Sequence, residues 1–129
     1  MKTLEQVMSE YPNLTREGMD IPGSEGFEQR RLYLINNAHE EINCAMDFID
    51  GAVVTKTPNK NWSSYNIKEL AESEYQTYIT NGSMICALLM MEIPIAEFKN
   101  EIQHRYSVSA FISNKWLMER MRRRTDLMS

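Results

Sequence analysis

The residues whose chemistry could serve catalysis are few, and they are scattered along the chain. Three carboxylates, Glu69, Glu72 and Glu74, lie close enough in the sequence to suggest a general acid–base pair. At helical spacing they fall mostly on the polar side of their segment, which indicates solvated surface side chains instead. His39 and His104 are far apart, and neither has a second ligand at the spacing of known metal motifs. The sequence therefore predicts no metal site, no cofactor and no enzymatic activity.

An anion could in principle be held just before the apolar run that starts at residue 84. Gly82 and Ser83 stand there, where the free amide groups of a helix N-terminus bind negative charge. A phosphate-binding loop has several glycines at fixed spacing and a lysine, which this stretch lacks. A plain helix cap made by Ser83 is therefore the preferred interpretation.

The end of the chain is the part that could bind a polyanion. From residue 105 onward there are six basic and two acidic residues, a balance of about +4, whereas the whole chain carries −4. Cations near the end of a helix also stabilise its dipole without any partner. An acidic chain, moreover, lacks the basic footprint that is typical of nucleic-acid binders. The candidate residues for nucleic-acid or partner binding are Lys115, Arg120, Arg122, Arg123 and Arg124.

Length and composition are those of one soluble domain. The chain has 129 residues, of which 43% are hydrophobic and 25% are charged. Its first residues lack the apolar run of a signal peptide, and no later stretch is long enough to span a membrane. We therefore expect a single globular domain over residues 1–129 in a cytoplasm; the resemblance described below implies that of a bacterial host cell. Cys44 and Cys86 lie in apolar helical patterns and are expected to be reduced.

Residues 62–94 organise the predicted fold. Apolar residues at helical spacing predict an amphipathic helix that ends at Ile79, with Asn66 and Glu69 as a capping box and Ser63 or Ser64 as a competing cap. Asn81 and Gly82 both tolerate positive φ and predict a break. Residues 84–91 have no polar face, so they predict a central helix enclosed by its neighbours, which Pro94 terminates.

The rest of the chain predicts further helices around that centre. These are a short helix over residues 4–11 capped by Thr3 with Gln6, a long amphipathic helix over 27–50, a short one over 96–103, and a last one over 114–124 capped by Ser113. Residues 12–26 form a loop, and residues 53–55 and 106–112 favour short strands. The fold class is a mainly α bundle of about five helices with one or two short strands. The apolar stripe of the long helix faces this core, with a dimer seam as the alternative. The predicted core residues are Ile35, Ala38, Ile42, Ala45, Ile49, Ile67, Leu70, Ile85, Leu88, Leu89, Trp116 and Leu117.

Several short runs resemble a family of small, functionally uncharacterised proteins of bacteriophages and integrated mobile elements. In that family a Ser-Tyr-x-Leu-Lys-His run precedes a Tyr-x-Ser-Asn-Gly-x-x-Ile-x-Ala run, and an extended segment and a basic helix follow. The matching runs here are residues 64–68, 78–87 and 110–115, and the resemblance covers residues 63–120. The chain departs from the pattern at Glu69, where the family has histidine, and around Ile93, where a glycine is usual. The resemblance implies a compact helical domain of phage or mobile-element origin, and it transfers no activity.

Two functions follow as expectations. The first is a non-enzymatic accessory protein that binds and modulates a host protein, for example a defence or replication factor, through charge complementarity of its acidic part. The second is a DNA-binding regulator that uses the basic C-terminal helix. Neither expectation requires a membrane or a cofactor, and a dimer remains open in both.

Overall fold

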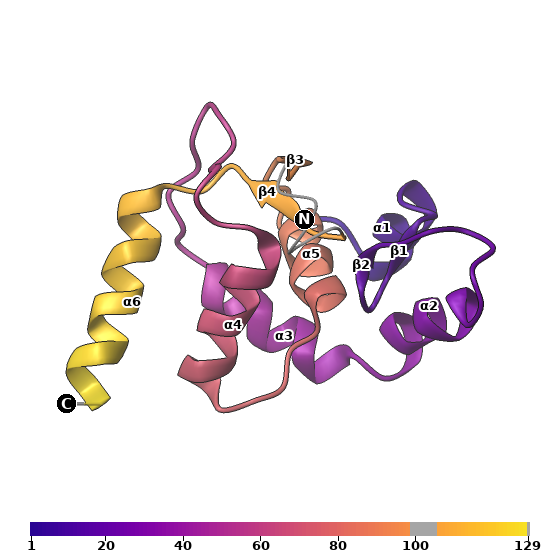
Figure 1. Cartoon of the computed structure of the whole chain (residues 1–129), viewed down its shortest axis with the longest axis horizontal. Helices are drawn as coiled ribbons and strands as arrows, with labels where there is room; N and C mark the ends of the chain where they lie inside the picture. Colours follow the sequence, from indigo (N-terminus) through magenta and orange to yellow (C-terminus); the bar gives the residue numbers. More distant parts are fainter. Residues whose placement is uncertain (99–105, 129) are drawn as a thin grey trace.

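The centre of the molecule is helix α5 (Asn81–Met90), around which the other elements are arranged (Figure 1). The structure is a computed structural model, and it describes residues 1–98 and 106–128. The first nine residues of α5 are all buried, with Leu88 at 0% and Leu89 at 7% exposure. The prediction of an enclosed central helix is therefore confirmed for residues 84–89; Met90 and Met91 are half-buried, and the helix ends at Met90, before the predicted stop at Pro94.

The described part of the chain is mainly α-helical, as the sequence predicts. Six helices carry most of the structure, and the strands form two small antiparallel sheets, β1 with β2 and β3 with β4. Besides α5, the elements are α1 (Leu4–Glu10), β1 (Leu14–Thr15), β2 (Gly18–Met19), α2 (Phe27–Asn36), α3 (His39–Ile49), α4 (Ser64–Tyr75), β3 (Ile95–Glu97), β4 (Val108–Ala110) and α6 (Asn114–Met128).

Helix α5 separates two groups of buried side chains. Met84 and Leu88 face a cluster formed with α4, β4, α6 and the second half of α3. Ile85 and Leu89 face a second cluster formed with α1, β1, α2 and the first half of α3. Because α5 has no polar face, it can supply both clusters at once, whereas an amphipathic helix could supply only one.

The long helix predicted over residues 27–50 is two helices. The chain leaves helical geometry at Asn37 and Ala38, between α2 and α3. The apolar stripe changes phase at this break, so Leu34 is fully buried while Ile35 is 37% exposed. Ile35 was predicted as a core residue, and that prediction is wrong. Ala38 and the stripe of α3, which packs on α5, are buried as predicted.

Helix α4 begins after Ser63, one of the two alternative caps, and ends earlier than predicted. Its capping box joins Ser63 to Asn66, so Asn66 occupies the third helical position instead of the cap. The helix stops at Tyr75, because Gln76 adopts left-handed geometry with φ +52°. Tyr78 therefore lies outside any helix and is 67% exposed, although the sequence placed it on the buried stripe.

The predicted break at Asn81–Gly82 is instead the start of α5, which Thr80 caps in place of Ser83. Gly82 is required there for close packing. Its amide donates to the Arg16 carbonyl at 2.9 Å, and an added Cβ would lie 1.9 Å from the Thr15 carbonyl oxygen. The β1–β2 hairpin thus sits directly on the first turn of α5.

The predicted loop over residues 12–26 contains this hairpin and is fixed at several points. Arg30 of α2 pairs with the buried carboxylate of Asp20 at 2.8 Å. Arg31 donates to the main-chain carbonyls of Met8, Tyr11 and Leu14. These bonds explain how a segment with little regular structure keeps one conformation.

The segment after α5 is a strand where a helix was predicted. Residues 95–97 form β3, which pairs with β4, whereas residues 99–103 of the predicted helix lie outside the described residues. The strand predicted over 106–112 is confirmed as β4. Val54, in the other predicted strand, makes one isolated bridge to Ile112.

Candidate functional site

Helix α6 carries the basic residues that the sequence singled out. Ser113 caps it by accepting a bond from the Trp116 amide at 3.2 Å, as predicted. Leu117 is fully buried, and the half-buried Trp116 meets the Phe48 ring edge-on with 5.9 Å between centroids. These contacts attach the first two turns of α6 to the body of the protein.

Arg120, which the sequence singled out as a binding residue, is part of this attachment. Its Nη2 donates to both carboxylate oxygens of Glu74, at 2.7 and 2.8 Å. Its guanidinium lies 4.5 Å from the Phe48 ring centre and 5.0 Å from the Trp116 ring, and its side chain is only 14% exposed. Arg120 is therefore a structural residue that joins α6 to α3 and α4.

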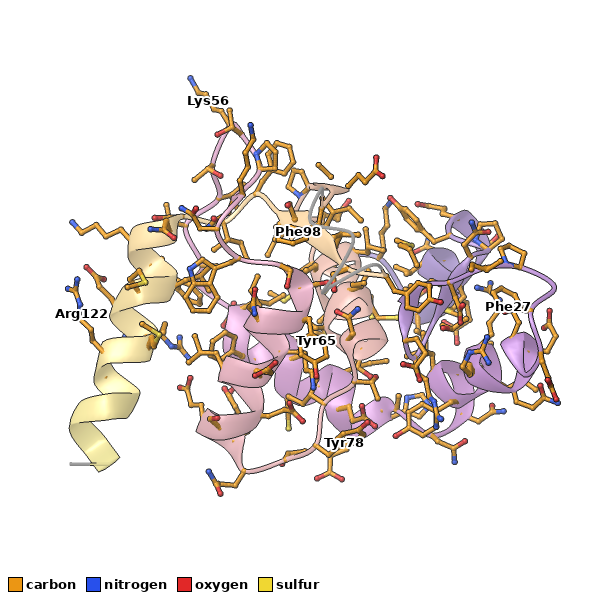
Figure 2. All side chains as sticks on the ribbon, in the orientation of Figure 1. Phe27, Lys56, Tyr65, Tyr78, Phe98 and Arg122 are labelled. Atoms are coloured by element: carbon orange, nitrogen blue, oxygen red, sulfur yellow. The ribbon has the colours of Figure 1, made fainter. Side chains whose placement is uncertain are left out.

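The other basic residues of α6 lie at the surface. Lys115, Arg122 and Arg123 are exposed, and Figure 2 shows Arg122 on the side of α6 that faces away from the other helices. Arg124 belongs to α6, but its side chain lies outside the described residues. Within the described part of the chain, no ion pair involves Lys115, Arg122 or Arg123.

Two further cations share this end of the molecule. The loop between α3 and α4 carries Lys56 at its tip and Lys60 nearby, both exposed (Figure 2). Every other described Lys or Arg side chain is used within the fold, in ion pairs or, for Arg31, in bonds to carbonyls. The uncommitted positive charge of the described residues is thus confined to this loop and α6, which form one end in Figure 1.

Two of the three carboxylates of α4 are also committed. Glu72 pairs with Lys68 at 2.9 Å and accepts the Ile79 amide at 3.1 Å, and Glu74 holds Arg120. Glu69 is exposed and has no ion pair or hydrogen bond to the described residues. Of the three carboxylates predicted to be solvated, only that of Glu69 has no partner among the described residues.

Sequence reasoning missed the buried carboxylate of Glu41, which fills the anion site considered at the start of α5. Its Oε1 accepts from the Thr80 amide at 2.7 Å and the Ser83 hydroxyl at 3.1 Å, and its Oε2 accepts from the Tyr33 hydroxyl. That last bond, with partial burial, raises the pKa of Tyr33 to about 12. Glu41 thus caps α5 with the chain's own negative charge, leaving this helix N-terminus unavailable to an external anion.

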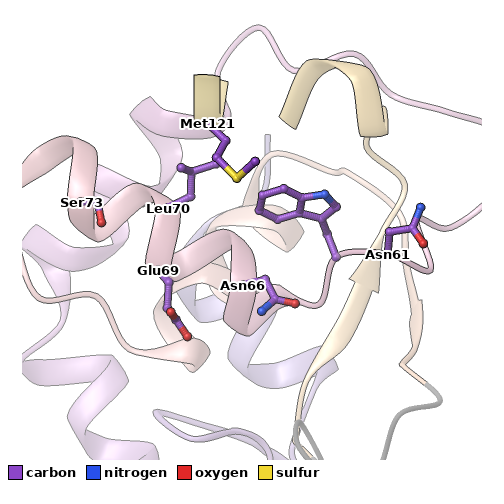
Figure 3. Close-up of a pocket in the computed structure, with 7 residues that line it drawn as sticks. Asn61, Asn66, Glu69, Leu70, Ser73 and Met121 are labelled. Atoms are coloured by element: carbon purple, nitrogen blue, oxygen red, sulfur yellow. The ribbon is translucent and has the colours of Figure 1, made fainter. Parts of the chain in front are cut away.

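The groove between α4 and α6 is the surface feature best suited to binding. It is a hollow of about 420 Å³, and its apolar lining residues, which we call its floor, are Trp62, Leu70 and Met121. Leu70 and Met121 are labelled in Figure 3. Figure 3 shows Asn66, Glu69 and Ser73 in succession along α4, with Asn61 on the opposite side. We call this hollow the α4 groove; its lining residues are Asn61, Trp62, Asn66, Glu69, Leu70, Ser73 and Met121.

The polar rim of the α4 groove has unused hydrogen-bonding groups. Asn66 Oδ1 accepts from the amide and hydroxyl of Ser63, which turns its Nδ2 away from that cap. The side-chain amide of Asn61, the hydroxyl of Ser73 and the carboxylate of Glu69 make no hydrogen bond to the described residues. An apolar floor with a few convergent polar groups is the usual composition of a binding site.

The α4 groove continues toward the end of α4. A second hollow of about 490 Å³ shares Glu69 and Ser73 with it and extends along Gln76 to Tyr78. Exposed aromatic side chains such as Tyr78 are frequent anchors at protein interfaces. Together the two hollows form one continuous strip on the outer side of α4.

Metal and thiol chemistry have little support in the described residues. Among them, no group of three His, Cys, Asp or Glu side chains is arranged to hold a metal ion, and His104 lies outside this part. Both cysteines are free thiols. Burial raises the pKa of Cys86 to about 12, so it stays protonated at neutral pH and is a poor nucleophile.

Comparison with models of known protein families, with curated proteins and with solved structures found no match. Among the described residues, no helix is both long and apolar enough to cross a bilayer.

Proposed function

We propose that the chain is a non-enzymatic accessory protein, encoded by a phage or mobile element, that binds and modulates a host protein through the α4 groove. The single observation that carries this proposal is the α4 groove itself. It combines an apolar floor with three polar side chains, those of Asn61, Glu69 and Ser73, that make no hydrogen bond to the described residues, and with the Nδ2 of Asn66, which the cap at Ser63 does not use. The resemblance of residues 63–120 to proteins of mobile elements supports the suggested origin.

The chemistry of the groove is consistent with binding and not with catalysis. Among the described residues of its lining, Glu69 is the only one with an ionisable side chain. A hydrolytic acid–base mechanism needs a second group poised to exchange a proton, and the neighbouring Glu72 and Glu74 are held by Lys68 and Arg120. The remaining groups can donate and accept hydrogen bonds, which orients a partner without changing it.

The test is to block the groove in the full chain. Ser73→Arg places a long side chain at the position that both hollows share, whereas Gln29→Arg on α2 introduces the same side chain at a remote exposed site. A photo-crosslinking residue at Tyr78 identifies what touches the strip in host lysate. We expect a specific crosslinked protein, whose binding to purified wild-type chain weakens at least tenfold with Ser73→Arg and is unchanged with Gln29→Arg.

Two outcomes would remove the basis of this proposal. One is that no protein is crosslinked at Tyr78 above background. The other is that a crosslinked protein binds the Ser73→Arg chain as tightly as the wild type, which would place its contact elsewhere. Circular dichroism of each variant establishes that the fold is retained.

The second candidate function is DNA binding at the cationic end. It is favoured by the observation that Lys56, Lys60, Lys115, Arg122 and Arg123 are the described cations without a partner in the fold. Gel-shift assays at two salt concentrations would test it, because each phosphate contact makes binding more salt-sensitive. Joint replacement of Lys115, Arg122 and Arg123 with Ala should lower the salt slope by up to roughly three. Absence of binding at low salt would reject this function.

A further inference from the structure

The strip along α4 has a consistent negative character. Its two hollows contain the carboxylates of Glu69 and Glu72, and no Lys or Arg is found among the described side chains that line them. The nearest cation on the helix is Lys68, whose ammonium lies 2.9 Å from Glu72 and 4.4 Å from the centre of the Tyr65 ring. Lys68 and Glu72 therefore neutralise each other, and the charge left over on the strip is that of Glu69.

Glu69 lies at the junction of the two hollows, where it would contact a ligand bound along the strip. It lines both hollows, so a ligand that passes from one to the other must cross it. On its one side is the apolar floor of Trp62 and Met121, and on the other is the exposed ring of Tyr78. An uncompensated carboxylate between two apolar contacts repels phosphates and attracts a cation.

The length of the strip corresponds to a short extended peptide. Asn66 and Gln76 are ten positions apart on or just after α4, about 15 Å at 1.5 Å per helical residue. An extended chain covers this distance in about five residues. The Asn61 and Asn66 amides and the Ser73 hydroxyl supply both donors and acceptors, which suits the alternating groups of a peptide main chain.

We propose that the α4 strip binds an extended segment of a partner protein in which an apolar side chain enters the α4 groove and a neighbouring Lys or Arg pairs with Glu69. This inference rests on the proposed function and specifies the chemistry of its partner. The apolar side chain rests on Leu70 and Met121, and the cation one or two residues away reaches the carboxylate. The occupant is a peptide with a cationic side chain, and the Glu69 carboxylate disfavours a phosphate backbone at this position.

The test measures binding of labelled peptides to the full chain by fluorescence polarisation. A pentapeptide library with apolar anchors is screened, and each binder is compared with versions in which Lys is acetylated or replaced by Glu. An exposed ion pair is worth roughly 0.2–1 kcal/mol. We therefore expect acetylation to weaken binding roughly two- to fivefold, replacement by Glu to weaken it further, and 0.5 M salt to reduce the difference.

Variants of the protein assign this preference to Glu69. In Glu69→Gln the Lys and acetyl-lysine peptides should bind equally, with the affinity for the acetylated peptide unchanged, and Glu69→Lys should reverse the preference. Glu28→Gln, which removes an exposed carboxylate from α2, is the matched control and should behave like wild type. Since Glu69 is exposed, these substitutions leave the core intact.

The results separate this inference from the proposed function. The inference would be overturned if Lys and acetyl-lysine peptides bound the wild-type chain equally, or if the preference for Lys survived Glu69→Gln. The proposed function would still stand if Ser73→Arg weakened binding of the crosslinked protein. Absence of any peptide binder alongside a partner crosslinked at Tyr78 would also overturn the inference, in favour of a folded surface. Concentration-dependent dimerisation abolished by Glu69→Gln would identify a second copy as occupant and equally overturn it.

Discussion

Replacing Gly82 with Ala tests the contact on which the position of α5 depends. Helix propensity alone predicts a gain in stability of up to about 1 kcal/mol, because Ala is a better helix former than Gly. The structure predicts the opposite. The new methyl group would lie 1.9 Å from the Thr15 carbonyl oxygen and 2.7 Å from the Arg16 Cα, so the β1–β2 hairpin would have to move away by more than 1 Å.

The size of the loss follows from what that movement breaks. The bond from the Gly82 amide to the Arg16 carbonyl, 2.9 Å long, contributes about 1 kcal/mol. Disturbed packing of the fully buried Leu14 in the cluster that also contains Ile85 adds about 1–3 kcal/mol, which is typical of overpacked sites. After subtraction of the propensity gain, we expect the free energy of unfolding to fall by about 1–3 kcal/mol.

Urea unfolding followed by far-UV circular dichroism measures this change. Gly51→Ala is the control: Gly51 has φ +82° and nothing within 4 Å of an added Cβ, so it should lose only about 1 kcal/mol from backbone conformation. If Gly82→Ala were as stable as wild type or more stable, the hairpin could not lie against α5 as described. The predicted sign would then be wrong as well as the magnitude.

Three further substitutions test other contacts of the fold. Leu88→Ala should lower the free energy of unfolding by about 2–5 kcal/mol, because it empties a fully buried site between helices; a loss below 1 kcal/mol would contradict that burial. Arg120→Ala should speed hydrogen exchange in α6 and leave any DNA binding unchanged, and an equal rate in both proteins would argue against the Glu74 contact. The pKa of Tyr33 is raised to about 12, so the contribution of its bond with Glu41 to the free energy of unfolding is complete below pH 10 and is lost as the pH rises from 10 to 12. Tyr33→Phe should therefore flatten this alkaline decline, and identical pH profiles would refute the bond to Glu41.

The parts of the fold that could be predicted were those with a local signal. Residues 84–91 have no polar face, and the only way to satisfy such a helix in water is to enclose it, which is what α5 shows. The cap pairs at Thr3 and Ser113 were likewise readable, because each bond joins residues three apart. In the basic helix, Leu117 was correctly assigned to the core.

The errors came from breaks that no residue type announces. Neither Gly nor Pro marks the end of α2 at Asn36 or of α4 at Tyr75, and the left-handed residue after α4 is Gln76. At the first break tertiary packing sets the phase of the apolar stripe, which leaves Ile35 at the surface. The helical spacing of apolar residues continues across both breaks, and so the predicted helices were longer than the observed ones.

The candidate site could be predicted only in fragments. Glu69 was singled out as a solvated carboxylate, but the floor of the α4 groove brings together Trp62 and Met121, which are distant in sequence. The same long-range packing places Glu74 and two aromatic rings beside Arg120, so its guanidinium is bound within the fold. Such pairings depend on how α6 crosses α4, and a single sequence does not encode that crossing locally.

The position of α5 between two groups of buried side chains has a practical consequence for mapping any partner. A fragment that ends before α4 would lose the helix on which α1 and the hairpin rest, and a fragment that starts after α3 would leave Ile85 and Leu89 uncovered in water. In a series of deletions, a fragment that fails to fold would therefore also fail to bind, and the two causes could not be told apart. Single substitutions on the outer side of α4 avoid this ambiguity.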